Sequence, residues 1–407
     1  MRDTPASPSF WRSPLRGPWF TSVLGLVLLV GITVLFVTGL VSYAAYNPGL
    51  AAVNDKTPDK GLLGFYLFDW PTDPHWLYRL TQGVHVTLGI TLIPVLLAKL
   101  WSVVPKLFAL PPARSLTHAL ERVSLLLLVG GGLFEFVTGV LNVQLDYLFP
   151  GSFYPLHFYG AWVFFAAFVA HAVLKVPAAV RNVRRAREEG ELVAPRPDPP
   201  TVSRRGALWF VGGGSLLLFG TTAGQSFDGP LRRTALLAPH GGADPGRGPN
   251  GFQINKTAAY AGIDRAETAE DAWRLVVVGR SGRTVRLGRA DLAQLPLHSS
   301  ALPIACVEGW STSDQWWRGV RLRDLAALVG HDGDPPDVLV ESLQRRGAFR
   351  HAALRANQVA DPRSLLALYV NGEPLSPDHG YPARVIVPAA PGVLNTKWVA
   401  RLTFGRV

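Results

Sequence analysis

The sequence predicts a multi-domain chain: an all-α transmembrane bundle of five helices, followed by a β-rich α+β domain. Two observations predict this architecture. Five long apolar runs fall within the first 224 of the 407 residues, and from about residue 250 the apolar residues occur instead in short strand-length segments separated by turns. The composition, 48% hydrophobic and 17% charged, excludes a disordered chain.

The first four apolar runs are each long enough to cross a bilayer, which takes about 20 residues as a helix. The fifth is shorter and contains three consecutive glycines. The runs are Phe20–Tyr43, Leu77–Val103, Leu116–Leu141, Phe158–Val180 and Ala207–Thr222. A single run is compatible with a buried core helix, but five in succession favour a membrane domain.

The basic residues of the connecting segments predict the orientation. Twelve lie in the N-terminal tail and in the loops at 104–115 and 181–205, whereas the two opposite loops hold only Lys56 and Lys60. Because cytoplasmic loops are enriched in basic residues, we expect a multi-pass protein of the cell membrane with a cytoplasmic N-terminus and an extracytoplasmic C-terminal domain. The lipid bilayer is thus a partner. Much of the net charge of +11 comes from basic residues in the predicted cytoplasmic segments, so no nucleic-acid partner is expected.

Four histidines lie in or beside the predicted helices, where such side chains are costly and usually functional. His157 and His171 are 14 residues apart on one helix, so they face the same way about 21 Å apart. That spacing suits two stacked haems held between helices. The depth of each histidine in the membrane can be counted in residues from the basic residue at the cytoplasmic end of its helix. By this count His85 and His157 lie at similar depth near the outer face, to within about 6 Å, and His118 and His171 lie at similar depth near the inner face.

The stretches GVHVTLG around His85 and HFYGAWVFFAAFVAHAVLK in the fourth helix resemble the four-helix cytochrome b subunits of formate dehydrogenases and nickel hydrogenases. The resemblance implies that His85 and His157 ligate one haem b. In that family a histidine of helix one completes a second haem, but helix one has no histidine here. The inner haem is therefore either absent or held by His118 and His171. His118 is otherwise an interfacial, solvated histidine.

Between the fourth and fifth runs, residues 181–205 form a charged, proline-rich loop. It ends in Ser203-Arg204-Arg205, which looks like an internal twin-arginine export signal; the alternative is two ordinary positive-inside arginines. No small-residue cleavage site follows, so we expect the fifth helix to remain as an anchor. The expected domains are a cytochrome-b-like domain at 1–180, linker and fifth helix at 181–224, a Gly/Pro-rich tether at 225–249, and an outer domain at 250–407.

Short apolar segments between turn residues predict that the outer domain is rich in strands. The expected strands are Arg274–Val278, Thr284–Leu287, Pro303–Val307, Asp337–Glu341, Arg384–Pro388 and Val399–Phe404, and Asp324–Val329 is expected to form a short helix. This mixture predicts an α+β fold.

The single cysteine, Cys306, lies in IACVEGWS, where a predicted strand enters a glycine-containing turn. One cysteine excludes an intrachain disulfide. A buried, inert thiol is the ordinary interpretation. However, a free thiol is a liability in an oxidising compartment, and a soft thiolate suits a transition metal. Taken alone, the cysteine leaves both interpretations open.

The surrounding motifs favour the metal. ACVEGWS, WRGV at 317–320, LRDL at 322–325, HGYPARVIVP at 379–388 and Lys397-Trp398 together resemble the sulfite-oxidase superfamily of molybdopterin enzymes. The resemblance implies a Mo-molybdopterin cofactor, with Cys306 as the catalytic thiolate ligand of molybdenum. It also implies cofactor contacts from Asn255, Lys256, His379, Arg384 and Lys397, and Ser342 is a further candidate. Arginine and lysine are suitable phosphate holders.

Within this superfamily, the Val-Glu-Gly-Trp-Ser after the cysteine differs from the Ala-Gly-Asn-Arg-Arg of eukaryotic-type sulfite oxidases and nitrate reductases. It is closer to bacterial envelope enzymes that reduce protein methionine sulfoxide. Trp310, Trp316 and Trp317 either line the substrate mouth or pack beneath it.

The expected function is a membrane-bound oxidoreductase. It would pass electrons between membrane quinol, haem b and the molybdenum centre for oxygen-atom transfer, with a small-molecule or protein sulfoxide as substrate. One alternative is a sulfite-type dehydrogenase that feeds electrons to quinone. The other is a non-catalytic haem electron conduit or binding module.

Overall fold

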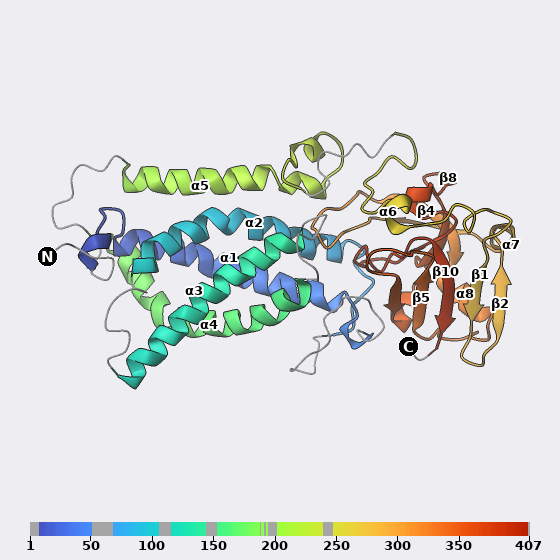
Figure 1. The fold of residues 1–407 in the computed structure, drawn as a ribbon, viewed down its shortest axis with the longest axis horizontal. Helices are drawn as coiled ribbons and strands as arrows, with labels where there is room; N and C mark the ends of the chain where they lie inside the picture. Colours follow the sequence, from blue (N-terminus) through green and yellow to red (C-terminus); the bar gives the residue numbers. More distant parts are fainter. Residues whose placement is uncertain are drawn as a thin grey trace. The chain divides into compact units, whose positions relative to one another are not determined.

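The structure, a computed structural model, describes residues 8–50, 68–105, 115–143, 153–187, 189–190, 193, 202–238 and 247–405. It divides into two compact units, each built from two separate stretches of sequence. The first unit is Met1–Val37 with His85–Thr222, and the second is Thr38–Val84 with Ala223–Val407. The first holds most of the long helices and the second holds the strands (Figure 1).

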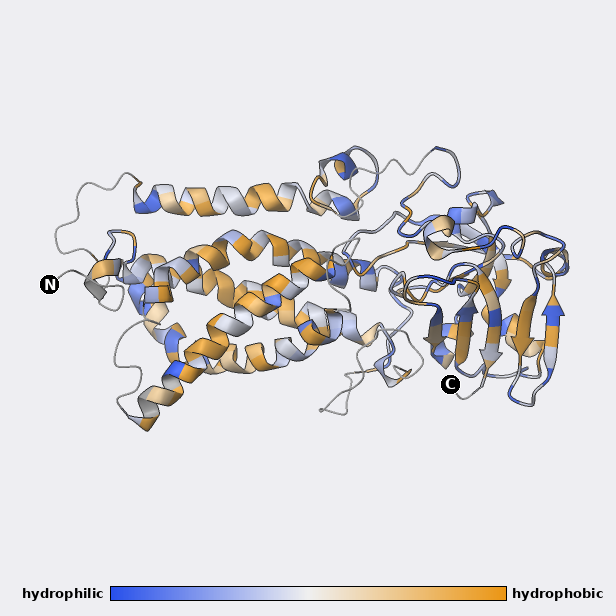
Figure 2. Cartoon of the chain, viewed as in Figure 1, coloured by the Kyte–Doolittle hydropathy of each residue, from blue (hydrophilic) through white to orange (hydrophobic). Residues whose placement is uncertain are grey.

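Five long helices carry the apolar runs of the sequence. They are α1 (Pro18–Ala44), α2 (Leu77–Val103), α3 (Leu116–Asn142), α4 (Tyr154–Arg184) and α5 (Arg204–Gly220). All five regions have the length and hydropathy of membrane spans. Apolar residues recur along the whole length of each helix, as expected for helices that face lipid (Figure 2). The predicted five-helix apolar domain is therefore confirmed.

Within the first unit, α1, α2 and α4 share an apolar core of leucine, isoleucine, valine and phenylalanine. Its buried members are Phe20, Leu24, Leu28, Ile32, Leu92, Val95, Leu96, Phe164 and Phe168. Helix α3 packs along α4. Aromatic stacking adds to this core, since the rings of Phe36 in α1 and Phe165 in α4 lie parallel with centroids 3.6 Å apart.

The second unit contains two five-stranded sheets. The first has the order β2 (Thr284–Leu287), β1 (Leu275–Val278), β10 (Val399–Phe404), β5 (Val338–Ser342), β6 (His351–Leu354). The second has the order β3 (His298–Leu302), β4 (Gln315–Arg321), β7 (Leu365–Val370), β8 (Glu373–Pro374), with β9 (Arg384–Ile386) also paired to β7. Strands β1 and β10 pair in parallel, whereas their other partners run antiparallel.

Short helix α6 (Ala258–Ala261) precedes the first strand, and α7 (Arg289–Gln294), α8 (Leu322–Ala327) and α9 (Ala356–Ala360) connect later strands. There are also 3-10 turns at η1 (Pro8–Trp11), η2 (Pro48–Leu50), η5 (Ala223–Ser226), η6 (Gly229–Thr234) and η7 (Pro377–His379). The predicted β-rich α+β class is confirmed. The first part of the segment that composition suggested as a tether thus forms η5 and η6.

One predicted strand is wrong. Pro303–Val307 lies outside the sheets, and within it only Ala305 makes isolated bridges, to Ser311 and Pro391. Its apolar side chains are explained by burial, because Ile304 and Cys306 belong to a separate apolar cluster. The sheet strand is instead β3, which ends one residue earlier at Leu302.

That separate apolar cluster lies apart from the main core of the second unit. Its buried members include Phe252, Leu302, Ile304, Trp310, Trp317, Leu365, Ala367 and Ile386, which come from β3, β4, β7, β9 and the loops between them. It surrounds Cys306, so the cysteine backbone is supported by strands of one sheet.

The described residues between α1 and α2, 45–50 and 68–76, belong to the second unit and pack within it. Nδ2 of Asn47 donates to Oε1 of Gln358 at 2.8 Å and to the carbonyl of Ala353 at 3.1 Å. The indole nitrogen of Trp70, a residue 1% exposed, donates to the carbonyl of Ala389 at 2.7 Å. Buried hydrogen bonds of this kind hold the connector to the strand-rich domain.

Candidate functional site

Cys306 lies in a tight turn closed by backbone hydrogen bonds. Its amide donates to the carbonyl of Trp310 at 2.9 Å, and the amide of Gly309 donates to the carbonyl of Cys306 at 3.1 Å. Gly309 has a φ of +89°, a conformation that side-chain-bearing residues rarely adopt, so the turn needs glycine there. The cysteine is 5% exposed.

The sulfur of Cys306 has a carboxylate beside it. Sγ lies 3.6 Å from Oε2 of Glu308, and the same oxygen accepts a 2.7 Å hydrogen bond from the indole of Trp310. Burial first, and then the charge of Glu308, raise the pKa of the Cys306 thiol well above its usual range. The thiol is therefore protonated at neutral pH.

Three predicted cofactor-binding side chains form a buried basic cluster, namely His379, Arg384 and Lys397, which are 1%, 3% and 9% exposed. Nη1 of Arg384 donates to the carbonyl of His379 at 3.3 Å, and the Nε atom of Arg384 has no partner among the described residues. Nζ of Lys397 donates to the carbonyls of Lys256 and Asp378, at 2.8 and 2.7 Å. The cations are thus held by carbonyl oxygens.

This cluster has the electrostatics of an anion site. Burial lowers the pKa of Arg384 to about 9. Burial, then repulsion from Arg384 and Lys397, lowers the pKa of His379 to about 3. Burial, then repulsion from Arg384 and Lys256, lowers the pKa of Lys397 well below its usual range. Trp317, which lies under Arg384, belongs to the same apolar cluster as Cys306. The charge of Asp378 opposes the shift of Lys397, whereas burial alone lowers the pKa of Arg384. A buried cation is costly, and a phosphate group would supply Arg384 with a charged partner.

The aromatic ring of Phe252 helps to fix His379. The two rings stack with centroids 3.8 Å apart, and Nε2 of His379 lies 2.8 Å from the carbonyl of Asn250. Because a carbonyl oxygen only accepts, Nε2 carries the hydrogen. The guanidinium of Arg384 lies 5.5 Å from the ring centroid of Trp317, which gives the buried cation an aromatic neighbour.

The other predicted contact residues lie around this cluster. Nζ of Lys256 donates to the carbonyl of Ala348 at 2.9 Å, and Asn255 is half-buried in the bend just before it. Oγ of Ser342 donates to the carbonyl of Lys397 at 2.7 Å, so this serine orients the lysine backbone. Their cofactor contacts stay predictions.

In the first unit, the rings of His85 and His157 lie with centroids 6.1 Å apart. Nδ1 of His85 lies 2.9 Å from the carbonyl of Leu35. Nδ1 of His157 lies 3.1 Å from Oε2 of Glu135 and 3.0 Å from Oγ1 of Thr138. A carbonyl or carboxylate at Nδ1 places the hydrogen there and the lone pair on Nε2, which is the arrangement of metal-binding histidines.

The inner histidine pair cannot be assembled from the described side chains. The side chain of His118, near the start of α3, lies outside the described residues, and His171 is half-buried in α4. Within the described part of the chain, no group of three or more His, Cys, Asp and Glu side chains is placed to hold a metal ion. Haem and molybdopterin bring their own ligand atoms and need only one or two from the protein.

The structure distinguishes the three tryptophans. Trp310 and Trp317 are 1% and 0% exposed and pack in the cluster around Cys306, whereas Trp316 is 55% exposed. Sequence reasoning missed Glu308 and Phe252. The signal for Glu308 was its position two residues after the only cysteine, where a turn brings its carboxylate back to the sulfur.

In cofactor-free protein, the stability of the outer domain is expected to fall as the pH is lowered from 7 to 4. His379 has a folded pKa of about 3, against 6.5 for an ordinary histidine. Between these values the unfolded chain binds more protons, so stability decreases by up to about 1.4 kcal/mol per pH unit. Urea unfolding at stepped pH measures the slope. His379→Gln should flatten it, and an equal slope in that variant would contradict the assignment.

Known proteins share the strand-rich part of this chain. Residues 261–406 match the family described as the oxidoreductase molybdopterin binding domain. Rat mitochondrial sulfite oxidase is 33% identical over 158 residues, which cover 33% of this chain and 29% of that protein. The uncharacterized oxidoreductase YuiH of Bacillus subtilis is 33% identical over 132 residues, covering 32% of this chain and 65% of that protein.

The matched region spans less than two thirds of the length of these relatives. Among solved structures, the sulfane dehydrogenase SoxCD from Paracoccus pantotrophus aligns over 33% of this chain and 39% of that chain, at 24% identity and a TM-score of 0.30.

Proposed function

We propose that this chain, whose residues 261–406 form an oxidoreductase molybdopterin-binding domain, is a membrane-anchored molybdenum enzyme that transfers oxygen atoms. The observation that carries the proposal is a single buried cysteine in the apolar cluster whose Trp317 ring lies under the buried cation Arg384. The hydrogen bonds of Arg384 and Lys397 that the described residues provide go to carbonyl oxygens. A sulfur ligand and buried cations are the two features that a metal bound to a phosphate-bearing pterin would use.

When bound, the cofactor supplies two-electron oxygen-atom transfer, and the protein positions and tunes it. Cys306 supplies a sulfur ligand and gives up its proton on binding. Arg384 and Lys397 offer N–H donors to phosphate. His379, neutral at pH 7, donates to the carbonyl of Asn250 and so contributes shape without adding a third charge.

A sulfoxide is the substrate class that we propose. Its reduction to a sulfide consumes two electrons and two protons and releases water. The support is the Val-Glu-Gly-Trp-Ser sequence after Cys306, which differs from the Ala-Gly-Asn-Arg-Arg of eukaryotic-type sulfite oxidases.

A sulfite-type dehydrogenase is the second candidate, favoured by the 33% identity to a sulfite oxidase. In this direction sulfite and water give sulfate, two electrons and two protons, and quinone accepts the electrons. Purified full-length protein should be assayed with methionine sulfoxide plus a quinol analogue, and with sulfite plus a quinone analogue. Turnover with the first pair alone supports the proposal, and turnover with the second pair alone replaces it.

We further propose that the membrane helices hold haem b between His85 and His157 and exchange electrons with membrane quinol. The ring separation of 6.1 Å and the Nδ1 contacts of both histidines support this. The five apolar helices and the basic segments between them support a multi-pass protein with an extracytoplasmic outer domain. Ser203-Arg204-Arg205 is proposed as the export signal. Ser203 is the N-cap of α5.

Replacement of either His85 or His157 by alanine is expected to remove the b-type haem absorbance, because a haem iron with one imidazole ligand is bound less tightly than one with two. Pyridine haemochrome analysis of purified protein measures the loss. His75→Ala is the matched control, since this histidine pairs with Asp314 in the other unit. His171→Ala decides the haem number: a halved haem content indicates two haems, and an unchanged content indicates one. An unaltered haem content in both His85→Ala and His157→Ala would refute the ligand assignment.

A further inference from the structure

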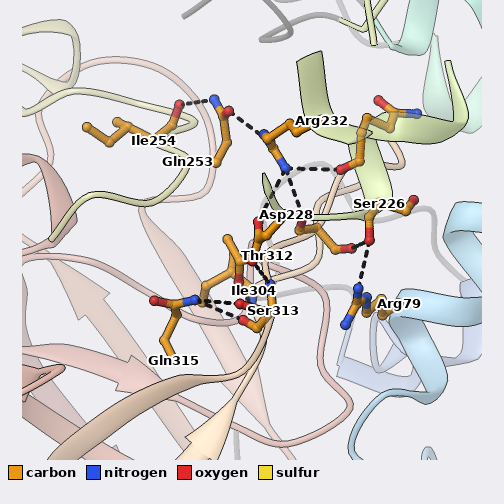
Figure 3. A network of polar contacts seen from close by, with 12 residues as sticks. Arg79, Ser226, Asp228, Arg232, Gln253, Ile254, Ile304, Thr312, Ser313 and Gln315 are labelled. Atoms are coloured by element: carbon orange, nitrogen blue, oxygen red, sulfur yellow. Dashed lines mark hydrogen bonds and ion pairs between the residues drawn. The ribbon is translucent and has the colours of Figure 1, made fainter. Parts of the chain in front are cut away.

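The connector that follows α5 packs against the Cys306 turn. It consists of η5 and η6, residues 223–234, and Figure 3 shows its polar contacts. The two 3-10 turns approach each other closely at Gly224, where an added Cβ would lie 2.3 Å from the carbonyl of Leu231. Only glycine permits this approach, so the connector has a defined fold of its own.

The connector pairs with backbone groups of the cysteine turn. Oγ of Ser226 donates to the carbonyl of Gly309 at 3.1 Å, and the amide of Ser311 donates to the carbonyl of Gln225 at 3.1 Å. Further along, the amide of Ser313 donates to Oδ2 of Asp228 at 2.6 Å. The turn therefore relies on residues 225–228, which precede the first strand of the same unit, to satisfy its polar backbone groups.

Arg232 is the centre of this network (Figure 3). Its Nη1 donates to the carbonyls of Gln225 and Ser311, at 3.1 and 3.0 Å, and its Nη2 donates to Oε1 of Gln253 at 2.8 Å. One side chain thus joins three segments: the connector, the cysteine turn and the start of the outer domain. Arg79, on α2, fixes the connector from the other side through the carbonyl of Ser226, at 2.7 Å.

Two short routes lead from Arg232 to the cysteine. Through the backbone, Arg232 holds Ser311, whose neighbour Trp310 accepts the amide hydrogen of Cys306. Through side chains, the guanidinium lies 5.9 Å from the ring centroid of Trp310, whose indole binds Glu308 beside Sγ. Both routes end at atoms that decide where the sulfur lies.

We propose that Arg232 is a positioning residue for the molybdenum site, which clamps the connector onto the turn and fixes the direction of the Cys306 sulfur. This inference rests on the proposed function, since it assigns the sulfur to the metal. In this proposal the connector after α5, residues 223–234, helps to fix the position of the Cys306 sulfur in addition to linking two parts of the chain.

The first test uses the reactivity of the thiol in cofactor-free, full-length protein. Because the chain has one cysteine, every label added by an aromatic disulfide reagent reports on Cys306. Arg232→Gln should speed labelling by about tenfold or more, because loss of charge-assisted bonds makes local opening of the turn more frequent. Arg232→Lys should restore part of the protection, since an ammonium can still reach one of the carbonyls.

The matched control is Arg233→Gln, which removes the same charge at the exposed neighbouring residue. It should label at the wild-type rate. Gln253→Met provides a second variant if Arg232→Gln does not fold. It removes the Nη2 partner of Arg232, together with the hydrogen bond from Gln253 to the carbonyl of Ile254, but leaves both Nη1 contacts, so it should speed labelling by less. The second readout is the electron paramagnetic resonance spectrum of Mo(V) in cofactor-loaded protein. Arg232→Gln should shift its g-values, whereas a purely structural role would lower only the yield.

Equal labelling rates and identical spectra in wild type and Arg232→Gln would overturn the inference. Failure of the proposed function has a different signature. Wild-type protein from a molybdate-fed, cofactor-producing host would then hold no molybdenum. The labelling comparison in cofactor-free protein still reports on the clamp in that case, so the two failures are distinguishable.

Discussion

Replacement of Cys306 by serine is expected to lower oxygen-atom transfer by more than about 100-fold. Loss of groups that merely support a metal ligand costs about 10–100-fold, and here the ligand itself is lost. The variant should fold, because serine is close in size to cysteine and Glu308, which lies 3.6 Å from Sγ, can accept a hydrogen bond from its hydroxyl. Turnover, molybdenum content and the Mo(V) spectrum measure the effect.

The haem spectrum is the internal control for Cys306→Ser. The proposed haem ligands, His85 and His157, belong to the other unit, so their absorbance should persist unchanged. A serine variant that turns over at the wild-type rate would show that the reacting centre lies elsewhere. A variant that loses molybdenum and haem together would indicate misfolding of the whole chain.

Replacement of Arg384 by methionine is expected to act in opposite directions on cofactor binding and on stability. Each lost charge-assisted hydrogen bond to phosphate costs about 1.5–3 kcal/mol, so two of them lower the affinity by roughly 100-fold or more. In cofactor-free protein, however, the substitution removes a buried cation whose Nε has no partner among the described residues. Replacing buried charge by an apolar side chain is often stabilising by about 1–4 kcal/mol.

Two measurements on Arg384→Met separate these effects: pterin and molybdenum content after purification, and thermal unfolding of protein from a host that lacks the cofactor. Arg318→Met is the matched control, because Arg318 lies on β4 of the same sheet but is exposed. It should change neither quantity. A cofactor-free Arg384→Met protein less stable than wild type, with full cofactor content, would refute the anion-site assignment.

The five long apolar helices were the most predictable part of the fold. α2 matches its apolar run at both ends, and α4 begins at Tyr154, four residues before the run predicted from Phe158. Unbroken hydrophobicity identifies such helices because lipid demands it along the whole span. The outer strands were less predictable. Prediction placed a strand at Pro303–Val307, where apolar side chains instead line a buried turn. Strands β6 and β7 were missed because they are buried on both faces and lack alternation.

For the site, sequence motifs identified the candidate residues, and the structure showed which side chains lie next to one another. The sequence singled out His379, Arg384 and Lys397, which the structure brings into one buried cluster. It gave no sign of Arg232, because an arginine in a Gly/Pro-rich segment, here followed by Arg233, looks like a solvated charge. Its role depends on three contacts at sequence separations of 7, 21 and 79 residues, which no local pattern encodes.

The packing of the α1–α2 connector has a consequence for biosynthesis. Asn47 and Gln358 are 311 residues apart in sequence, and Trp70 and Ala389 are 319 apart. The ribosome therefore releases the connector long before the surface that receives it exists. Contacts of such long range close late, since the intervening loop entropy must be overcome first. The indole of Trp70 therefore lacks its carbonyl partner until residue 389 has been synthesised.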